Sequence, residues 1–196
     1  MKIERVLLQG KHVRLEPLTA AHIPGLSEVG LDPDLRQWTL IPATPDEMRA
    51  YVENALAEEK AKESLPFATI EAASSRVIGA TRFCYIEPAH RRVEIGFTWI
   101  AKPWQRTPIN TEAKYLMLRH AFEVFGCIRL EFITDVLNER SRAALLRIGA
   151  KQEGILRRHM IMDSGRIRDT MLFSIIDSEW AGIKRMLEGK LDRELK

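Results

Sequence analysis

The segment Gln105-Arg106-Thr107-Pro108-Ile109-Asn110-Thr111 marks the start of a helix and decides much of what the sequence says about the fold. Thr107 is a favoured N-cap residue, and Pro108 is a favoured first helical residue. The N–H groups of a first helical turn have no partners inside the helix, so they readily bind an anion such as phosphate. The pattern predicts a helix with a candidate anion site at its start, although an ordinary capped helix shows the same pattern.

Strand and helix patterns alternate on both sides of this segment. Strands are predicted over residues 12–18, 66–72, 76–86, 92–100 and 128–136 and in a final hairpin around residues 163–165. Helices are predicted from residue 19, from residue 44, over residues 108–125 and 138–148, and as a polar C-terminal helix at about 179–194. This order predicts an α/β fold around a largely antiparallel sheet with some parallel pairing.

Two of these elements carry a more detailed pattern. Thr44, Pro45 and Glu47 have the spacing of a capping box, in which the Thr and Glu side chains bond each other's backbone N–H groups. Strict alternation in the strand over 92–100 predicts two faces: Val93, Ile95, Phe97 and Trp99 on one, and Glu94, Gly96 and Thr98 on the other.

Length and composition limit the classes of protein that remain. With 196 residues, 45% hydrophobic residues and 29% charged residues, the chain is expected to form a single domain over residues 1–196. The net charge of +3 is far from that of a nucleic-acid binder, and no apolar run suggests a membrane span. The start of the chain does not resemble a secretory signal, which favours the cytoplasm. Neither the cysteines, Cys84 and Cys127, nor the histidines have the spacing of a metal site.

An ordered set of short motifs links the chain to a known superfamily. The motifs are Glu94-Ile95-Gly96-Phe97, Trp104-Gln105, Thr111-Glu112-Ala113-Lys114, Ala121-Phe122-Glu123, Asn138-Glu139-Arg140-Ser141-Arg142, Gly149-Ala150, Glu153-Gly154-Ile155-Leu156-Arg157, Arg168-Asp169-Thr170 and Glu179-Trp180. In this order they resemble the GCN5-related N-acetyltransferases (GNAT), and in particular the RimJ/RimL branch of ribosomal-protein N-terminal acetyltransferases. The resemblance implies a mixed, largely antiparallel sheet flanked by helices, with a splayed strand pair that holds acyl-CoA.

The resemblance also implies which residues contact CoA. These cofactor-binding candidates are Ile100, Gln105, Arg106, Thr107, Ile109, Asn110, Thr111 and Asn138. The phosphate loop of the family has small residues where Pro108 and Asn110 stand here. Pro108 lacks an N–H and Asn110 adds bulk, so we expect looser CoA binding than a glycine-rich loop gives.

Acyl transfer to an amine needs a base for the amine proton, and Glu94 is the candidate because the resemblance places its strand beside the thioester. The alternative is a surface glutamate paired with Arg82, Arg91 or Arg92. Ser141 is the candidate acid for the departing thiolate, because Leu145 stands where many relatives have a tyrosine. Trp38 is the candidate for the wall of the acceptor site, with a core aromatic residue as the alternative.

The resulting function is transfer of an acetyl group from acetyl-CoA to a primary amine, either a protein N-terminal α-amine or a small molecule. An inert CoA-binding or interaction module is the alternative of another class. An antibiotic-type acetyltransferase of the same fold is a third, for which Glu94, Glu131 and Asp135 would line an acidic acceptor cleft. No metal, membrane or nucleic acid is expected to take part, and a homodimer is left open.

Overall fold

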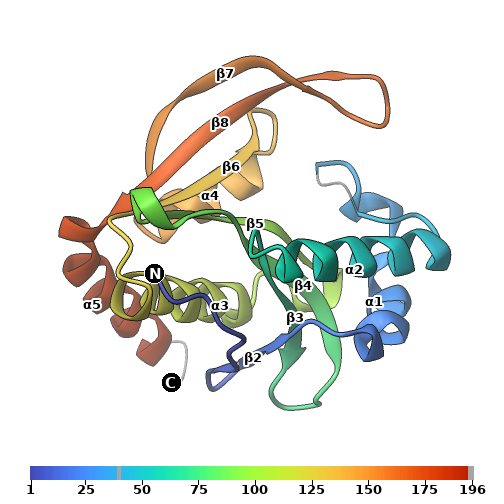
Figure 1. Ribbon diagram of the computed structural model, residues 1–196, viewed down its shortest axis with the longest axis horizontal. Helices are drawn as coiled ribbons and strands as arrows, with labels where there is room; N and C mark the ends of the chain where they lie inside the picture. The colour runs from blue at the N-terminus through green and yellow to red at the C-terminus, as the bar shows by residue number, and fades with distance from the viewer. Residues whose placement is uncertain (39–40, 194–196) are drawn as a thin grey trace.

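In the computed structural model, which describes residues 1–38 and 41–193, the strands of the described chain form one eight-stranded mixed sheet (Figure 1). The strand order is β1-β2-β3-β4-β5-β6-β8-β7, and every neighbouring pair is antiparallel except the parallel pair β5–β6. The strands are β1 (Leu8–Gln9), β2 (Val13–Pro17), β3 (Leu65–Glu71), β4 (Val77–Glu87), β5 (Arg92–Ile100), β6 (Arg129–Asp135), β7 (Lys151–Ile161) and β8 (Ile167–Ile176). The predicted fold class and its largely antiparallel sheet are confirmed.

The helices lie on both sides of the sheet. They are α1 (Ile23–Gly30), α2 (Pro45–Lys60), α3 (Pro108–Arg119), α4 (Glu139–Arg147) and α5 (Asp177–Arg193). In Figure 1, α1 and α2 lie together on one side and α3 and α5 on the other, and each pair packs on its own hydrophobic cluster. The C-terminal helix therefore forms as predicted, although residue 194 of the predicted range lies outside the described residues.

The predicted helix starts at residues 45 and 108 are confirmed, but the capping box at α2 has a different partner. Thr44 Oγ1 accepts the Glu47 N–H at 3.2 Å, as a capping box requires. The Glu47 carboxylate, however, accepts the N–H of Ala43 at 2.7 Å instead of that of Thr44. The glutamate thus ties down the loop before the helix rather than the N-cap residue itself.

The helix predicted over residues 108–125 changes its winding before its end. α3 stops at Arg119, and His120–Val124 form a π-helical turn in which the Phe125 N–H donates to the His120 carbonyl at 3.0 Å. The wider turn leaves the Phe125 ring 4.4 Å from the His120 ring and 5.3 Å from the Phe83 ring. Gly126 then ends the segment at a φ of 66°, in the left-handed region that favours glycine.

A β-bulge in β5 overturns the predicted two faces of this strand. Arg82 of β4 pairs with Gly96 and Ala80 pairs with Trp99, so one residue of β4 faces the two residues Phe97 and Thr98. One inserted residue turns the following side chains to the opposite face. Val93 and Ile95 accordingly pack in the cluster under α3, whereas Trp99 packs in the cluster under α1 and α2. The prediction that all four apolar residues share a face is therefore wrong for the part of the strand that follows Gly96, where Trp99 faces the opposite side.

The parallel strands β5 and β6 pair only where they begin. Their paired residues are Arg92 with Arg129, Val93 with Leu130 and Glu94 with Glu131. Beyond these pairs the two strands diverge, so the second half of β5 and the end of β6 face each other without strand pairing. The splayed strand pair expected from the resemblance is therefore present, and its opening forms the base of the cleft described below.

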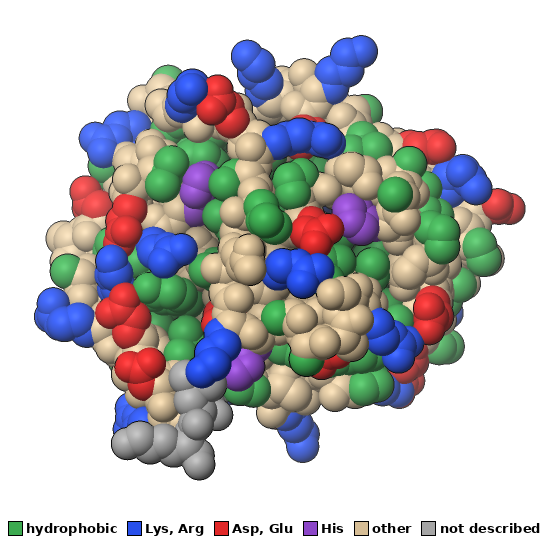
Figure 2. All heavy atoms as spheres, turned by 90° about the horizontal axis from the view of Figure 1, so that it is seen from below, with side chains coloured by type: hydrophobic (Ala, Val, Ile, Leu, Met, Phe, Trp, Pro, Cys, Tyr) green, Lys and Arg blue, Asp and Glu red, His purple; other side chains and the backbone are tan. Residues whose placement is uncertain are grey.

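The surface carries no single dominant charge on the face shown in Figure 2, where acidic and basic side chains alternate among apolar ones. This agrees with the small net charge of +3. Across residues 1–38 and 41–193, no helix has both the length and the apolar character needed to cross a bilayer.

Candidate active site

A cleft of about 580 Å³ opens between the divergent parts of β5 and β6. It is lined by β5, by the start of α3, by α4 and β6, by the β7–β8 hairpin and by the loop after α1. The predicted site residues that line it are Trp38, Glu94, Ile100, Gln105, Arg106, Thr107, Asn110, Asn138 and Ser141. Ile109 and Thr111 do not line it, because both side chains are buried elsewhere, and the prediction for them concerns their backbone N–H groups.

The start of α3 is held to both neighbouring walls of the cleft by Gln105. Its Nε2 donates to the Ile100 carbonyl at 2.8 Å, and its Oε1 accepts a hydrogen bond from Arg140 Nη1 at 2.5 Å. The carbonyl of Ile100, a residue expected to contact CoA, therefore already has a protein partner. The guanidinium groups of Arg106 and Arg140 line the cleft at this end.

The capping predicted at Thr107 is present and uses one of the first-turn N–H groups. Thr107 Oγ1 accepts the Ile109 N–H at 3.4 Å and donates to the Trp104 carbonyl at 2.7 Å. Since Pro108 has no N–H, Asn110 is the first residue of α3 whose N–H is not used by the cap and whose side chain lines the cleft.

A second helix start, that of α4, faces the same cleft. Asn138 Oδ1 accepts the Ser141 N–H at 3.0 Å, as an N-cap does. The Ser141 side chain is half-buried and lines the cleft, and the buried Leu145 lines it one turn later. Asn138 and Ser141 therefore lie where the sequence predicted them, at the start of a helix and in the same cavity as Glu94.

Glu94 is a buried carboxylate, only 6% exposed, in the paired part of β5. Burial, and secondarily the nearby Glu131, raise its pKa to about 7. The Cys84 thiol lies 3.8 Å from Oε1, and Gly96 leaves the space that the carboxylate and this thiol occupy. The alternative of a surface glutamate paired with arginine is wrong. Arg82 pairs with Glu58, and Arg92 pairs with Glu87 and Glu131.

Lys114 is a cleft residue that the sequence analysis did not single out. Its side chain is buried, and its Nζ donates to Thr98 Oγ1 at 2.7 Å, which in turn shares a hydrogen bond with Thr81 Oγ1 at 2.7 Å. Burial lowers its pKa to about 7. The spacing of four residues from Asn110 could have placed it on the cleft face of α3, but a lysine in a helix usually lies in solvent.

The part of the cleft near the β7–β8 hairpin is lined by Trp38, His159, Met160 and Arg168. Trp38 is half-buried, and the Arg166 guanidinium lies over its ring at 5.7 Å. Glu131 and Asp135 do not line the cleft: Glu131 pairs with Arg92 and Arg129, and Asp135 pairs with Arg166. Of the three carboxylates expected to line an acidic acceptor cleft for an antibiotic-type enzyme, Glu94 lines it and these two do not.

Comparison with known proteins agrees with this arrangement. Residues 12–151 match the family model of the acetyltransferase (GNAT) domain. A GCN5-related N-acetyltransferase from Brucella melitensis is 36% identical with a TM-score of 0.89, over 97% of this chain and 87% of that chain. RimJ of Mycobacterium smegmatis, solved in complex with CoA-disulfide, shares the fold at a TM-score of 0.79 and 24% identity, over 91% of this chain and 88% of that one.

Among curated proteins, YdaF of Bacillus subtilis (strain 168), provisionally named a ribosomal N-acetyltransferase, is 34% identical over 99 residues. This alignment covers 50% of the present chain and 53% of YdaF, so the match spans about half the length of the curated relative. The family model covers far more of the chain, and the splayed strands, the capped start of α3 and the cleft between them agree with it. The chain belongs to the GNAT acetyltransferase family.

Proposed function

We propose that this protein transfers an acetyl group from acetyl-CoA to a primary amine in the cleft between β5 and β6. The observation that carries the proposal is a buried carboxylate, Glu94, with a pKa of about 7, at the point where two parallel strands separate. A carboxylate with this pKa is matched to proton transfer at neutral pH.

The cleft fits the two ends of acetyl-CoA. Arg106, Arg140 and the N–H of Asn110 supply positive charge and a donor for the phosphates at the start of α3. On the side facing β6, the second half of β5 has no strand partner, so its backbone groups there are offered to the pantetheine arm. Pro108, and the engagement of the Ile109 N–H with Thr107, leave fewer free N–H groups than a glycine-rich loop offers, so we expect weaker binding.

When bound, acetyl-CoA supplies an activated acetyl thioester. Glu94, in its ionised form, accepts the proton that the amine nitrogen loses as its bond to the acetyl carbon forms, directly or through one water. As the carbon–sulfur bond breaks, the Ser141 hydroxyl donates a proton to the sulfur and regains one from solvent. Lys114 in its charged form opposes the rise in the Glu94 pKa and so keeps part of this carboxylate ionised at neutral pH.

The acceptor is a primary amine, and the name of the relative YdaF favours a ribosomal protein N-terminus. The half-buried Trp38 at the hairpin end of the cleft gives a flat apolar surface for the residue next to that amine. Small-molecule amines share the same reacting group, so an acceptor panel is needed to separate the two.

The test is a thiol-release assay with acetyl-CoA and a panel of peptide and small amines. We expect turnover that rises with pH through a midpoint near 7 when the acceptor is a weakly basic amine that stays neutral throughout, because only ionised Glu94 accepts a proton. Glu94→Gln is expected to lower kcat by about 100- to 10,000-fold and to abolish this pH dependence, with CoA binding by calorimetry unchanged.

Glu139→Gln is the matched control, because it removes an exposed carboxylate near the start of α4 that does not line the cleft. Equal activity of Glu94→Gln and wild type would remove Glu94 from the mechanism. Binding of CoA without turnover of any amine would favour the inert CoA-binding module, and no binding at millimolar CoA would exclude both functions.

A further inference from the structure

Arg168 on β8 is a buried cation that lines the cleft without a carboxylate partner. Its side chain is 7% exposed, and its Nε has no hydrogen-bond partner. Within the described part of the chain, its guanidinium takes part in no ion pair or hydrogen bond, whereas Arg166, in the turn directly before β8, pairs with Asp135. Burial lowers the pKa of Arg168, but an arginine stays charged at neutral pH.

The carboxylates nearest to Arg168 are already engaged or only partly ionised. Asp135 pairs with Arg166 and also accepts the N–H of Leu137 at 2.9 Å. Glu94 is within electrostatic reach, because each of the two groups shifts the pKa of the other, but the pKa of Glu94 is near 7. The described residues therefore supply no full counter-charge to Arg168.

A buried and unpaired charge costs free energy of folding, and replacing such a group by an apolar one is often stabilising. Its presence in a cleft is therefore best explained by a ligand that supplies the missing negative charge. The CoA phosphates have their own cationic residues, Arg106 and Arg140, at the start of α3. Arg168 instead lies on the β7–β8 hairpin, where it is the cross-strand partner of Met160, and it is within electrostatic reach of Glu94.

We propose that the Arg168 guanidinium binds a carboxylate carried by the acceptor, so that the preferred substrate is an amine with an anionic carboxylate close to the reacting nitrogen. The inference rests on the proposed acetyltransferase function. A guanidinium binds a carboxylate through two parallel N–H···O bonds, which would fix the acceptor with its amine toward Glu94. A free amino acid and a peptide with an acidic residue near its N-terminus both carry this chemistry.

The test compares matched acceptors in the thiol-release assay: a free amino acid against its amide, and a short peptide with glutamate at its second position against the same peptide with glutamine. For wild type we expect kcat/KM to favour the carboxylate member of at least one pair by about 10- to 100-fold. The favoured pair identifies the source of the carboxylate. In Arg168→Gln the preference is expected to disappear, and in Arg168→Lys, which keeps the charge but loses the fork, to be intermediate.

Arg157→Gln is the matched control, since it removes an exposed arginine of β7 that does not line the cleft and is expected to keep the preference. Equal kcat/KM within both pairs for wild type would overturn the inference while leaving the acetyltransferase intact. If no amine is turned over, calorimetry on the CoA-bound protein decides: tighter binding of the carboxylate than of the amide supports the site, and equal binding rejects it.

A stability measurement separates a ligand-binding role from a structural one. Arg168→Met is expected to raise the Tm of the ligand-free protein by a few degrees, because it removes an unpaired buried charge. A fall in Tm would show that Arg168 supports the fold, and it would overturn the argument from the missing partner.

Discussion

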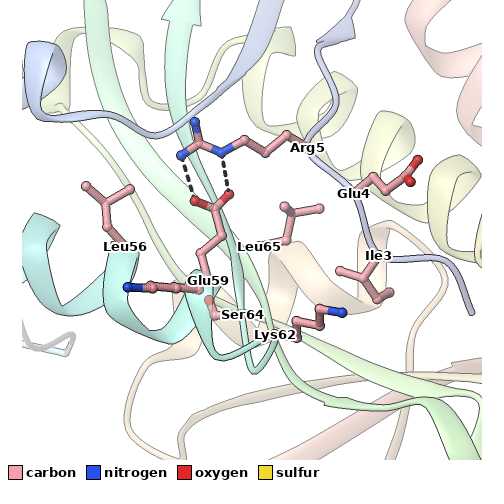
Figure 3. Close-up of a pocket in the computed structure, with 9 residues that line it drawn as sticks. Ile3, Glu4, Arg5, Leu56, Glu59, Lys62, Ser64 and Leu65 are labelled. Atoms are coloured by element: carbon pink, nitrogen blue, oxygen red, sulfur yellow. Dashed lines mark hydrogen bonds and ion pairs between the residues drawn. The ribbon is translucent and has the colours of Figure 1, made fainter.

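Two hollows of this molecule differ in whether their charged side chains form ion pairs. The first lies between the N-terminal segment and the end of α2, has a volume of about 270 Å³ and includes Arg5 and Glu59 in its walls (Figure 3). There the Arg5 guanidinium bonds both Glu59 oxygens, at 3.0 and 2.6 Å, and donates to the Leu18 carbonyl at 3.1 Å. In the cleft between β5 and β6, by contrast, Lys114 and Arg168 are buried and neither forms an ion pair with any residue in 1–38 or 41–193.

The same contrast occurs within one turn of α3. The buried Glu112 carboxylate accepts the N–H groups of Lys11, His12 and Val13 at 2.8, 2.7 and 2.9 Å, and it lies against Gly10, where a Cβ would collide with it. It thereby holds the loop before β2 to α3. Lys114, two residues later, donates to a single threonine hydroxyl. Buried polar groups with a full set of hydrogen bonds thus support the fold, whereas buried charges with few partners mark the site where a ligand is expected.

The largest effect is expected at the fully partnered Glu112. Glu112→Ala leaves three backbone N–H groups without their acceptor, and we expect a loss of about 3–5 kcal/mol in the free energy of unfolding, measured in urea. Glu112→Gln keeps one acceptor oxygen and should lose clearly less. A loss below 1 kcal/mol (about the effect of an ordinary substitution) in the alanine variant would show that the three hydrogen bonds of Glu112 contribute little to the stability of the fold.

An effect of opposite sign is expected at Lys114. Lys114→Met should raise the free energy of unfolding at pH 7 by about 1–4 kcal/mol, because it removes the burial of an ammonium group. The folded-state pKa of about 7 lies below the ordinary value of 10.5, so this penalty is full below pH 7 and is lost as the pH rises to 10.5. The gain from the substitution should therefore be largest at low pH and vanish near pH 10.5 in denaturation curves.

The same variant has a kinetic signature. Without the Lys114 charge the pKa of Glu94 rises, so the midpoint of the pH–kcat profile should move above 7. A destabilised variant with an unmoved midpoint would place Lys114 among the structural residues instead.

The smallest effect is expected in the hollow of Figure 3. The Arg5 side chain is 50% exposed, so solvent screens its pair with Glu59. Arg5→Gln should cost no more than about 1 kcal/mol, with an effect that shrinks further in high salt. Denaturation of this variant at low and high salt measures this contribution to stability. Acetyl transfer by the same variant should equal that of wild type in both conditions.

Features that depend on neighbouring residues could be predicted from the sequence. Thr107 with Pro108, and Asn138, begin helices as expected, because capping acts within a few residues. The ordered motifs also determined the fold class and the splayed strand pair. The predicted roles of Glu94, Ser141 and Trp38 remain proposals, although all three side chains line one cleft.

Features that depend on residues far apart in the chain could not be predicted in this way. The bulge at Phe97 arises from pairing with β4 and turns Trp99 to the opposite face, which strict alternation within β5 could not predict. Likewise, Glu112 and Lys114 look alike in sequence as charged residues of one helix. Their difference comes from what the fold places against them, three backbone N–H groups in one case and a threonine hydroxyl at the wall of the cleft in the other.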